Sequence, residues 1–234
     1  MERHRISQDL LYAVRTGHGH AAYVAALAEF PLTEFVPPLA SQDFKKAFWI
    51  NLYNAFVLLF LKENPASYRN KGGFFGQKRI GLRPFTVSLD DIEHGVLRRG
   101  AWKWGLGYVQ NPFPGVFART FMPDHLDFRI HFALNCGAAS CPPIAYYEPH
   151  ELDAQLGLAL RGYLEAECRY DTATNTVAVP KLLSWYRGDF GGRRGIRQLL
   201  ESQNIIPKNS IPQNARTSLR FRPYDWTLRP DGGK

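Results

Sequence analysis

The chain has 234 residues, of which 45% are apolar and 21% charged, a composition that predicts a globular protein and excludes a disordered one. The 20 Gly and 16 Pro follow no period, which excludes collagen-like and coiled-coil chains. Three cysteines are too few for a disulfide scaffold and their odd number is typical of a reducing compartment, whereas the formal net charge of +8 suggests an anionic partner.

The first forty residues are expected to be helical. Apolar residues recur at helical spacing from 7 to 30 and are interrupted by Gly17-His18-Gly19, which predicts two helices joined by that turn. A proline-rich connector, Pro31–Pro38, follows. Residues 1–40 are therefore predicted to form a helical N-terminal arm.

The main domain is expected to begin with a long helix. Apolar residues on related faces predict a helix over Asp43–Leu61 that ends before Pro65. The Gly- and Arg-rich stretch 66–87 predicts a loop with short extended pieces. Ser88 followed by Asp91 resembles a capping box, which predicts a helix over 89–98 that Gly100 would end.

The second half of the chain mixes short elements. The aromatic, Pro- and Gly-rich segment Trp102–Pro123 predicts a long structured loop, and alternating apolar residues over Asp127–Asn135 predict a β-strand. The remaining predictions are a helix over 150–168, a strand over 175–179, a helical turn over 182–186, a short helix over 196–203 and a strand over 218–228. We expect one α+β domain over 41–228, in which a small antiparallel sheet packs with several helices, and a disordered tail over 229–234.

Location and partners follow from what the chain lacks. The N-terminus has no apolar stretch of the kind found in secretory signals, and the longest apolar segment, Ala55–Leu61, is far shorter than the ~20 residues that cross a bilayer. Basic residues occur in small groups such as Lys45-Lys46 and Arg98-Arg99, without a nucleic-acid-binding module. We therefore expect a cytoplasmic protein with no membrane span and with solvated surface charge, and nucleic acid is an improbable partner.

The densest group of chemically capable residues surrounds the end of the predicted strand. His131 lies within that strand, on the face opposite Phe132, and Cys136 and Cys141 flank the small residues that end at Ser140. Because Pro142 follows, Cys141 could lie at the N-cap of a short turn, where free N–H groups stabilise a thiolate. The alternative is that both cysteines are small buried hydrophobes.

Further candidates lie on the two predicted helices. Glu93 and His94 are adjacent, so they project in different directions and cannot both face one point squarely; with Arg98 they form either part of a site or a solvated face. Asn51 and Asn54 lie on one face of an apolar helix, and buried amides need partners. They are expected to bond a neighbouring loop, or else to orient an imidazole or a substrate.

Aromatic segments near the C-terminus have mainly a structural interpretation. The segments Trp185–Phe190 and Tyr224–Trp226 each combine aromatic residues with one acid, a pattern that fits a corner locked by a buried hydrogen bond. Asp189 is the functional candidate among them. Four histidines are expected at the surface, namely His18, His20, His125 and His150.

Together these motifs resemble a family of bacterial and plant proteins known as "domain of unknown function 547". The resemblance covers about residues 44–228 and rests on Phe48–Ala55, Ser88–His94 with Arg98, His131–Gly137, Ser140–Pro143, Trp185-Tyr186 with Asp189-Phe190, and Tyr224–Trp226. It implies that the Asn, Glu-His, His and Cys groups belong to one site, and it brings no established activity. The run Cys136–Cys141 is also similar to the Cys-Gly-Ser-Cys-Trp segment of papain-like cysteine peptidases, which would imply a permuted papain-like arrangement because the histidine precedes the cysteines.

Several functions remain open. The first is a cysteine-dependent hydrolase or acyl transferase, in which Cys141 or Cys136 attacks a carbonyl, and His131 or His94 carries the proton. Glu93 or an asparagine amide would orient the imidazole; the substrate-binding or orienting residues would be Asn51, Asn54, Arg98 and Ser140. The alternatives are a metal site made by His131, both cysteines and Glu93 or His94, a redox-active cysteine pair, and a module that binds a ligand without turnover. We predict the first, with a small-molecule or peptide substrate and with no cofactor or metal.

Overall fold

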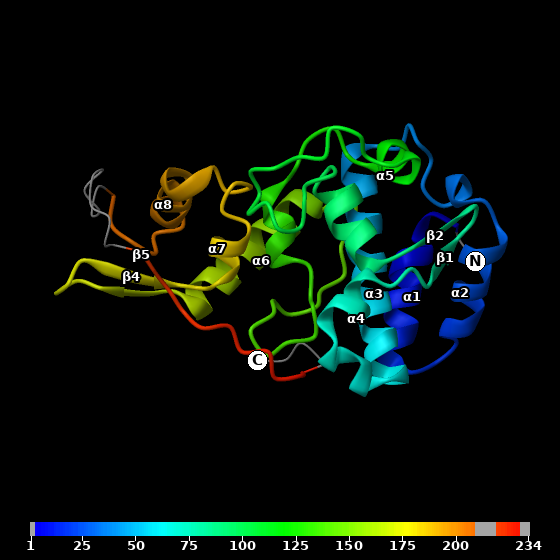
Figure 1. The fold of residues 1–234 in the computed structure, drawn as a ribbon, viewed down its shortest axis with the longest axis horizontal. Helices are drawn as coiled ribbons and strands as arrows, with labels where there is room; N and C mark the ends of the chain where they lie inside the picture. The colour runs from blue at the N-terminus through cyan, green and yellow to red at the C-terminus, as the bar shows by residue number, and fades with distance from the viewer. Residues whose placement is uncertain (1–2, 209–218, 230–234) are drawn as a thin grey trace.

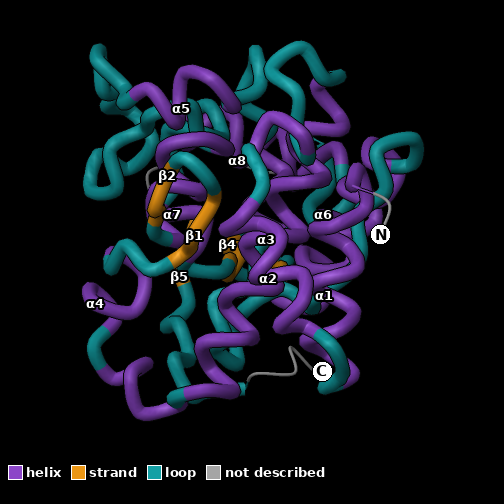
Figure 2. Tube along the Cα trace, turned by 90° about the vertical axis from the view of Figure 1, so that its right-hand side faces the viewer, coloured by secondary structure: helices purple, strands orange, loops and turns teal. Residues whose placement is uncertain are grey.

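The structure is a computed structural model and describes residues 3–208 and 219–229 (Figure 1). It consists of helices and two small sheets, which confirms the predicted α+β class. Figure 1 shows α1 to α4 in one half of an elongated molecule and α7, α8, β4 and β5 in the other, and Figure 2 looks onto the end that carries α1 and α2. Residues 230–234 of the predicted tail lie outside the described residues.

The N-terminal helices form as predicted. α1 (Ile6–Thr16) and α2 (His20–Glu29) are joined by a turn in which Gly17 and Gly19 have φ of 81° and 72°. Only glycine adopts this left-handed conformation without strain, so the two glycines explain where one helix ends and the next begins. α1 packs along α3, to which it turns its apolar face.

α3 (Gln42–Glu63) is the central helix of the larger core. The Ser41 hydroxyl accepts a hydrogen bond from the Phe44 N–H (3.2 Å) and caps its start, and the helix ends just before Pro65, as predicted. By length and composition α3 could cross a membrane, but 89% of its most apolar window is buried inside the fold. Its hydropathy is therefore that of a core helix wrapped by other elements.

The next segments contain more structure than the predicted loop. A 3₁₀ turn (Pro65–Arg69) leads to α4 (Lys71–Gly76) and to an antiparallel hairpin of β1 (Ile80–Leu82) and β2 (Phe85–Val87). Ser88 and Asp91 then form the predicted capping box, because the Ser88 Oγ accepts from the Asp91 N–H (3.0 Å) and the Asp91 carboxylate accepts from the Ser88 N–H (2.8 Å). The helix that follows is a π-helix over Asp91–Leu97.

Two predictions in the middle of the chain are wrong. The loop predicted over Trp102–Pro123 contains α5 (Val116–Phe121), and the predicted strand Asp127–Asn135 is a 3₁₀-helix over Phe128–Phe132. The Asp127 carboxylate accepts a hydrogen bond from the Arg129 N–H (3.1 Å) and caps this helix. His131 lies in this helix and Leu134 follows just after it, and both line the same pocket, whereas a strand would have placed them on opposite faces.

The C-terminal half follows the predicted order of elements. α6 (Leu152–Glu167) precedes β3 (Arg169–Asp171) and β4 (Thr176–Val179), and α7 (Leu182–Trp185) and α8 (Gly192–Ser202) follow. β3 and β4 are antiparallel, and β5 (Leu219–Phe221) joins β4 in parallel. This last strand is shorter than predicted, and residue 218 at its expected start lies outside the described residues.

Two hydrophobic cores meet along α6. The larger surrounds α3 and includes Leu152 and Leu156 of α6; the smaller joins Leu160 and Leu164 of the same helix to β4, α7 and α8. A pocket lined by Tyr53 and Leu134 of the first core and by Leu182 of the second lies where the two meet.

Candidate functional site

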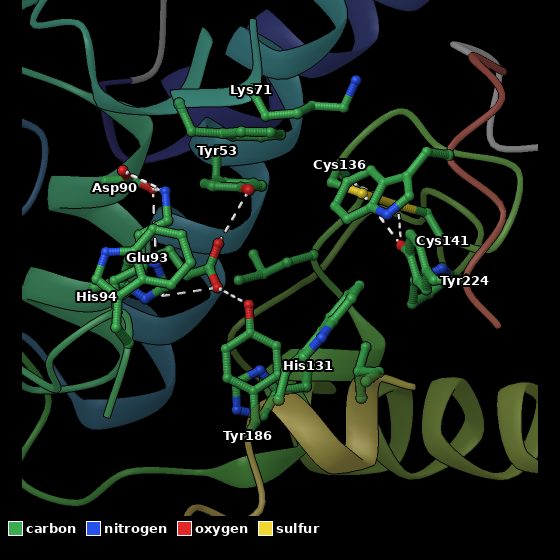
Figure 3. Close-up of a pocket in the computed structure, with 18 of the residues that line it drawn as sticks. Tyr53, Lys71, Asp90, Glu93, His94, His131, Cys136, Cys141, Tyr186 and Tyr224 are labelled. Atoms are coloured by element: carbon green, nitrogen blue, oxygen red, sulfur yellow. Dashed lines mark hydrogen bonds and ion pairs between the residues drawn. A yellow bond between two sulfur atoms is a disulfide. The ribbon is translucent and has the colours of Figure 1, made fainter. Parts of the chain in front are cut away.

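The pocket has a volume of about 400 Å³ and draws its walls from segments far apart in the sequence. Its polar side chains are Tyr53 of α3, Lys71 of α4, Asp90, Glu93, His94, Lys103, His131, Tyr186 and Tyr224, together with Cys136 and Cys141. Aromatic and aliphatic residues form the rest of the wall (Phe75, Trp104, Leu106, Leu134, Leu182, Trp185, Trp226). In Figure 3 the Glu93–His131 side of the pocket faces the two cysteines and Tyr224.

Glu93 is the central carboxylate of this site. Its two oxygens accept hydrogen bonds from the hydroxyls of Tyr186 (2.7 Å) and Tyr53 (3.1 Å), which come from different elements (Figure 3). Burial alone would raise the pKa of the Glu93 carboxyl, but His94, the Tyr186 hydroxyl and Arg98 outweigh it, so the pKa lies below its usual value. Glu93 is therefore an ionised, hydrogen-bonded carboxylate.

His94 is held as a neutral imidazole beside Glu93. Its Nδ1 lies 2.9 Å from the Nη1 of Arg98, and a guanidinium can only donate, so Nδ1 accepts and the proton resides on Nε2. Burial lowers the pKa of His94 more than the Glu93 charge raises it. The Nε2 faces Asp90 at 3.6 Å, and Asp90 in turn accepts from Lys103.

Glu93 and His94 both reach the pocket from the π-helix. The Arg98 N–H bonds to the carbonyl of Glu93, five residues earlier, which widens the turn relative to an α-helix. The two adjacent residues, expected to diverge on an α-helix, both line the pocket with their side chains largely buried.

Asp189 joins the two histidines through Arg98. Its carboxylate accepts from the Nε (2.7 Å) and Nη2 (3.1 Å) of Arg98 and lies 2.8 Å from the Nε2 of His131. The side chains of Asp189 and His131 are each 1% exposed, so the group is shielded from water. Burial would raise the pKa of Asp189, but the hydrogen bonds from His131 and Arg98 hold it at about 2.

His131 is consequently oriented as a base. Because ionised Asp189 can only accept, the His131 Nε2 carries the ring proton and Nδ1 is left as the acceptor. Burial lowers the pKa of His131 more than Asp189 raises it, so the ring is neutral near pH 7. Tyr186 stacks on it with ring centroids 3.9 Å apart and fixes its plane.

Cys136 and Cys141 form a disulfide in the wall opposite His131 (Figure 3). The Cys141 Sγ accepts from the backbone N–H of Cys136 (2.9 Å), and the Tyr224 hydroxyl lies 3.1 Å from that sulfur and 3.2 Å from the other. Among the described residues no hydrogen bond joins an imidazole to either sulfur. In this oxidised form neither cysteine is a nucleophile; the third, Cys168, is free and buried elsewhere, which raises its pKa to about 12.

The two asparagines of α3 bond to main chain rather than line the pocket. The Asn54 amide donates to the Ala133 carbonyl (3.0 Å) and accepts from the Asn135 N–H (2.9 Å); the Asn51 amide makes the same pair of bonds with the main chain of Tyr147. The Asn135 side chain donates to the Pro142 carbonyl (2.7 Å), and this bond closes the loop that carries both cysteines. Asn54 thus links α3 to the backbone just before the cysteine loop.

Ser140 holds the C-terminal segment against that loop. Its Oγ accepts from the Asp225 N–H (2.9 Å), and its own N–H donates to the Asp225 carbonyl (3.2 Å). Tyr224 is thereby placed over the two sulfurs. Ser140 itself does not line the pocket.

The structure therefore brings together Glu93, His94, His131 and both cysteines in one pocket, with Arg98 behind them. Three contributors received only structural or minor roles from the sequence, namely Asp189, Tyr186 and Tyr224. The sequence shows them in two segments that combine aromatic residues with one acid. The residues around each segment do not indicate which histidine or cysteine it would contact in the fold. Within residues 3–208 and 219–229 no group of three or more His, Cys, Asp or Glu is placed to hold a metal ion.

Comparison with known proteins gives one match. A family model described as "Protein of unknown function, DUF547" matches residues 38–164, more than half of the chain. This range includes α3, the π-helix and the cysteine loop, whereas Tyr186, Asp189 and Tyr224 come after it. No curated protein and no solved structure matches the chain significantly.

Proposed function

Because the chain belongs to the DUF547 family, whose description names no activity, we propose from the pocket itself that the protein is a cysteine-dependent hydrolase or acyl transferase. Cys141, in its reduced form, is the nucleophile. His131, oriented by Asp189, is the general base and acid. Glu93 and His94 belong to the wall that holds the substrate.

The observation that carries this proposal is the buried Asp189–His131 pair. A carboxylate that accepts from one imidazole nitrogen leaves the other as a base of fixed tautomer and orientation, the arrangement on which nucleophilic catalysis depends. Arg98 fixes the same carboxylate from its other side. This role for Asp189 replaces the expectation that Glu93 or an asparagine amide orients the imidazole.

The cysteine side supplies its own activation. The Cys136 N–H and the Tyr224 hydroxyl both lie within hydrogen-bond distance of the Cys141 Sγ, and two donors stabilise a thiolate. Burial raises the pKa of Tyr224, so its hydroxyl keeps its proton and remains a donor. Cys136 has only the Tyr224 contact among these, which favours Cys141 as the nucleophile.

The substrate binds between the two walls. The thiol proton of Cys141 passes through a bridging water to the Nδ1 of His131, and the sulfur forms a bond to the substrate carbonyl carbon. The bond from that carbon to the leaving group then breaks, and the leaving group takes the proton back from Nδ1. Water completes hydrolysis of the thioester, or a second nucleophile completes acyl transfer.

The shape of the pocket indicates the class of substrate. A volume of about 400 Å³ with aromatic and aliphatic walls suits a small molecule with an apolar body, or one side chain of a peptide. The reduced thiol that the reaction needs is the form expected in the cytoplasm, where we place the protein.

Alkylation of the reduced protein tests the nucleophile. With limiting iodoacetamide at about pH 6, mass spectrometry should show Cys141 modified before Cys136 and before buried Cys168, because only a stabilised thiolate reacts at that pH. Equal labelling of Cys136 and Cys141 would contradict the assignment.

A panel of p-nitrophenyl esters tests the base. We expect reduced protein to hydrolyse at least one member, and His131→Gln and Asp189→Asn to lower kcat by about 10²-fold or more. His125→Gln, at an exposed histidine, is the matched control and should keep full activity. Turnover by His131→Gln equal to that of the control would remove His131 from the mechanism.

The disulfide favours one second candidate, a thiol–disulfide oxidoreductase. In that case Cys136–Cys141 would accept two electrons from a dithiol substrate, which would itself leave as a disulfide. The distinguishing measurement is reduction of the protein by a small dithiol: an oxidoreductase should pass the electrons on to a disulfide acceptor such as insulin, whereas the proposed hydrolase should not.

A further inference from the structure

An aromatic patch on the outside of the molecule adjoins the pocket, whose wall includes Trp104 and Leu106. The patch consists of the large apolar side chains that are exposed in the segment before α5, which are Trp102, Trp104, Leu106, Tyr108, Val109 and Phe113. Phe113 is 82% exposed and Trp104 is 72% exposed. Large apolar side chains gathered in this way on a folded protein mark a surface that binds a partner or a membrane.

Main-chain hydrogen bonds hold the hairpin that carries most of the patch. Residues 101 and 110 form a β-bridge, and inside it the Trp102 N–H donates to the Val109 carbonyl (2.9 Å). The Leu106 carbonyl accepts from the Gly188 N–H (2.7 Å), which ties the tip of this hairpin to the turn that carries Asp189. Exposure of the aromatic side chains is therefore a property of the fold.

Positive charge accompanies the patch. The sequence from 94 to 123 contains no Asp or Glu, and its Arg119 is exposed, whereas Lys103 is paired with Asp90. The Tyr108 hydroxyl lies against Gly192, the first residue of α8, whose next two residues are Arg193 and Arg194. In Figure 1 the segment runs along the upper side of the molecule between α8 and α5.

We propose that the aromatic patch and its basic surroundings form a surface that binds the interface of a membrane containing anionic lipids. Tryptophan and tyrosine favour the headgroup region because one part of each ring system is apolar and another can hydrogen-bond. Exposed arginine side chains beside them are attracted to anionic headgroups. A nucleic acid would match the charge, but the aliphatic side chains between the rings suit acyl chains and offer nothing to a phosphodiester backbone.

Membrane binding places the pocket at the lipid surface. Trp104 and Leu106 belong both to the patch and to the pocket wall, so the pocket opens where acyl chains and headgroups meet. This consequence for the substrate, an amphiphile delivered from the bilayer, rests on the proposed function, whereas the binding itself does not.

Vesicle sedimentation with the full chain tests the binding. The protein should sediment with phosphatidylcholine vesicles that contain phosphatidylglycerol, less with pure phosphatidylcholine, and less again as salt is raised. The double variant Trp102→Ser/Phe113→Ser, at two patch residues that do not line the pocket, should lower the partition coefficient by about tenfold or more. Leu158→Ser, at an exposed leucine of α6, is the matched control and should bind as the original does.

Other outcomes would overturn the proposal. Failure of the original protein to bind phosphatidylglycerol vesicles, or equal binding by the double variant and the control with unchanged circular dichroism, excludes a membrane surface. A dimer in gel filtration that the double variant dissociates would assign the patch to a second copy of the chain, and tight binding of a single-stranded RNA in place of vesicles would assign it to nucleic acid. Failure of the ester assay leaves this result untouched, because the vesicles report binding alone.

Discussion

Asp189 illustrates how one buried carboxylate organises two other charged or polar groups. Its ion pair with Arg98 is almost entirely removed from water, and the desolvation of two such charges roughly cancels their attraction. Removal of one partner is different, because it leaves the other charge buried and unpaired at a cost of about 3–5 kcal/mol. The pair therefore contributes orientation of His131 and His94 more than it contributes net stability.

The two buried histidines make stability depend on pH. Burial lowers the pKa of His131 and of His94, so near pH 6.5 and below the unfolded chain binds protons that the folded chain does not. The stabilisation is thus complete above about pH 6.5 and is lost as the pH falls, by at most about 1.4 kcal/mol per pH unit for each histidine.

Urea unfolding at a series of pH values measures this effect. Between about pH 7 and pH 5 the free energy of unfolding should fall, and His131→Gln should flatten the slope. His125→Gln, at an exposed histidine, should reproduce the slope of the original. Parallel slopes for all three proteins would show that His131 titrates in the folded state as it does in the unfolded one.

At the scale of elements, α3 contributes Tyr53 to the pocket and also positions the site through two asparagines that do not line it. The amides of Asn51 and Asn54 bond to main-chain groups that belong to no regular helix or strand. Asn51 bonds to Tyr147, and Asn54 bonds to the main chain just before the cysteine loop. A buried main-chain group left without a partner costs about 1–3 kcal/mol, so each amide is expected to stabilise the fold appreciably.

The pair Asn51→Ala and Asn54→Ala separates stability from site geometry. Both variants should lower the free energy of unfolding, by about 2–4 kcal/mol each, because each leaves a buried N–H and a carbonyl unpaired. Only Asn54→Ala should change the alkylation rate of Cys141, since Asn54 holds the backbone before the cysteine loop whereas Asn51 holds Tyr147. Equal alkylation rates in the two variants would contradict the link from α3 to that loop.

Helices could be predicted from the sequence where the periodic pattern of apolar residues extends over several turns. α1, α3 and α6 each show several helical turns of apolar residues, and Gly17 marks the end of α1 while Ser41 caps the start of α3. The segment 127–135 is too short for alternation to distinguish a strand from a 3₁₀-helix, and α5 has barely more than one turn. The π-helix could not be predicted, because it differs from an α-helix in its main-chain hydrogen bonds and its amino-acid sequence looks like that of an ordinary helix.

At the scale of the whole molecule, two cores that share α6 enclose the pocket. The family resemblance predicts one site that includes Glu93, His131 and the cysteines, and these residues line one pocket. The sequence did not reveal that Asp189 would pair with His131, since 58 residues separate them and only the packing of the smaller core brings them into contact. Local sequence patterns therefore identify candidate site residues, whereas tertiary packing determines which of them form hydrogen-bonded pairs.

Reduction of the disulfide should leave this architecture intact. Cys136 and Cys141 are only five positions apart, so the loop they close is short and its opening costs about 2 kcal/mol. Thermal unfolding with and without dithiothreitol should show a Tm lowered by about 5 °C with a single cooperative transition. The double variant Cys136→Ser/Cys141→Ser should be insensitive to the reductant, and a reduced protein that no longer unfolds cooperatively would contradict the expectation.

The close approach of Gly107 and Gly188 joins the outside of the protein to its interior. A Cβ atom at position 188 would lie 2.3 Å from the Gly107 carbonyl carbon, so even one methyl group there must push the hairpin and the turn apart. Such a wedge would displace the exposed rings at one end and the Asp189 carboxylate at the other. The hairpin and the turn are therefore mechanically coupled. A displacement of the hairpin is transmitted through the contact between the main chains of Gly107 and Gly188 to Asp189, and from Asp189 to the imidazole of His131.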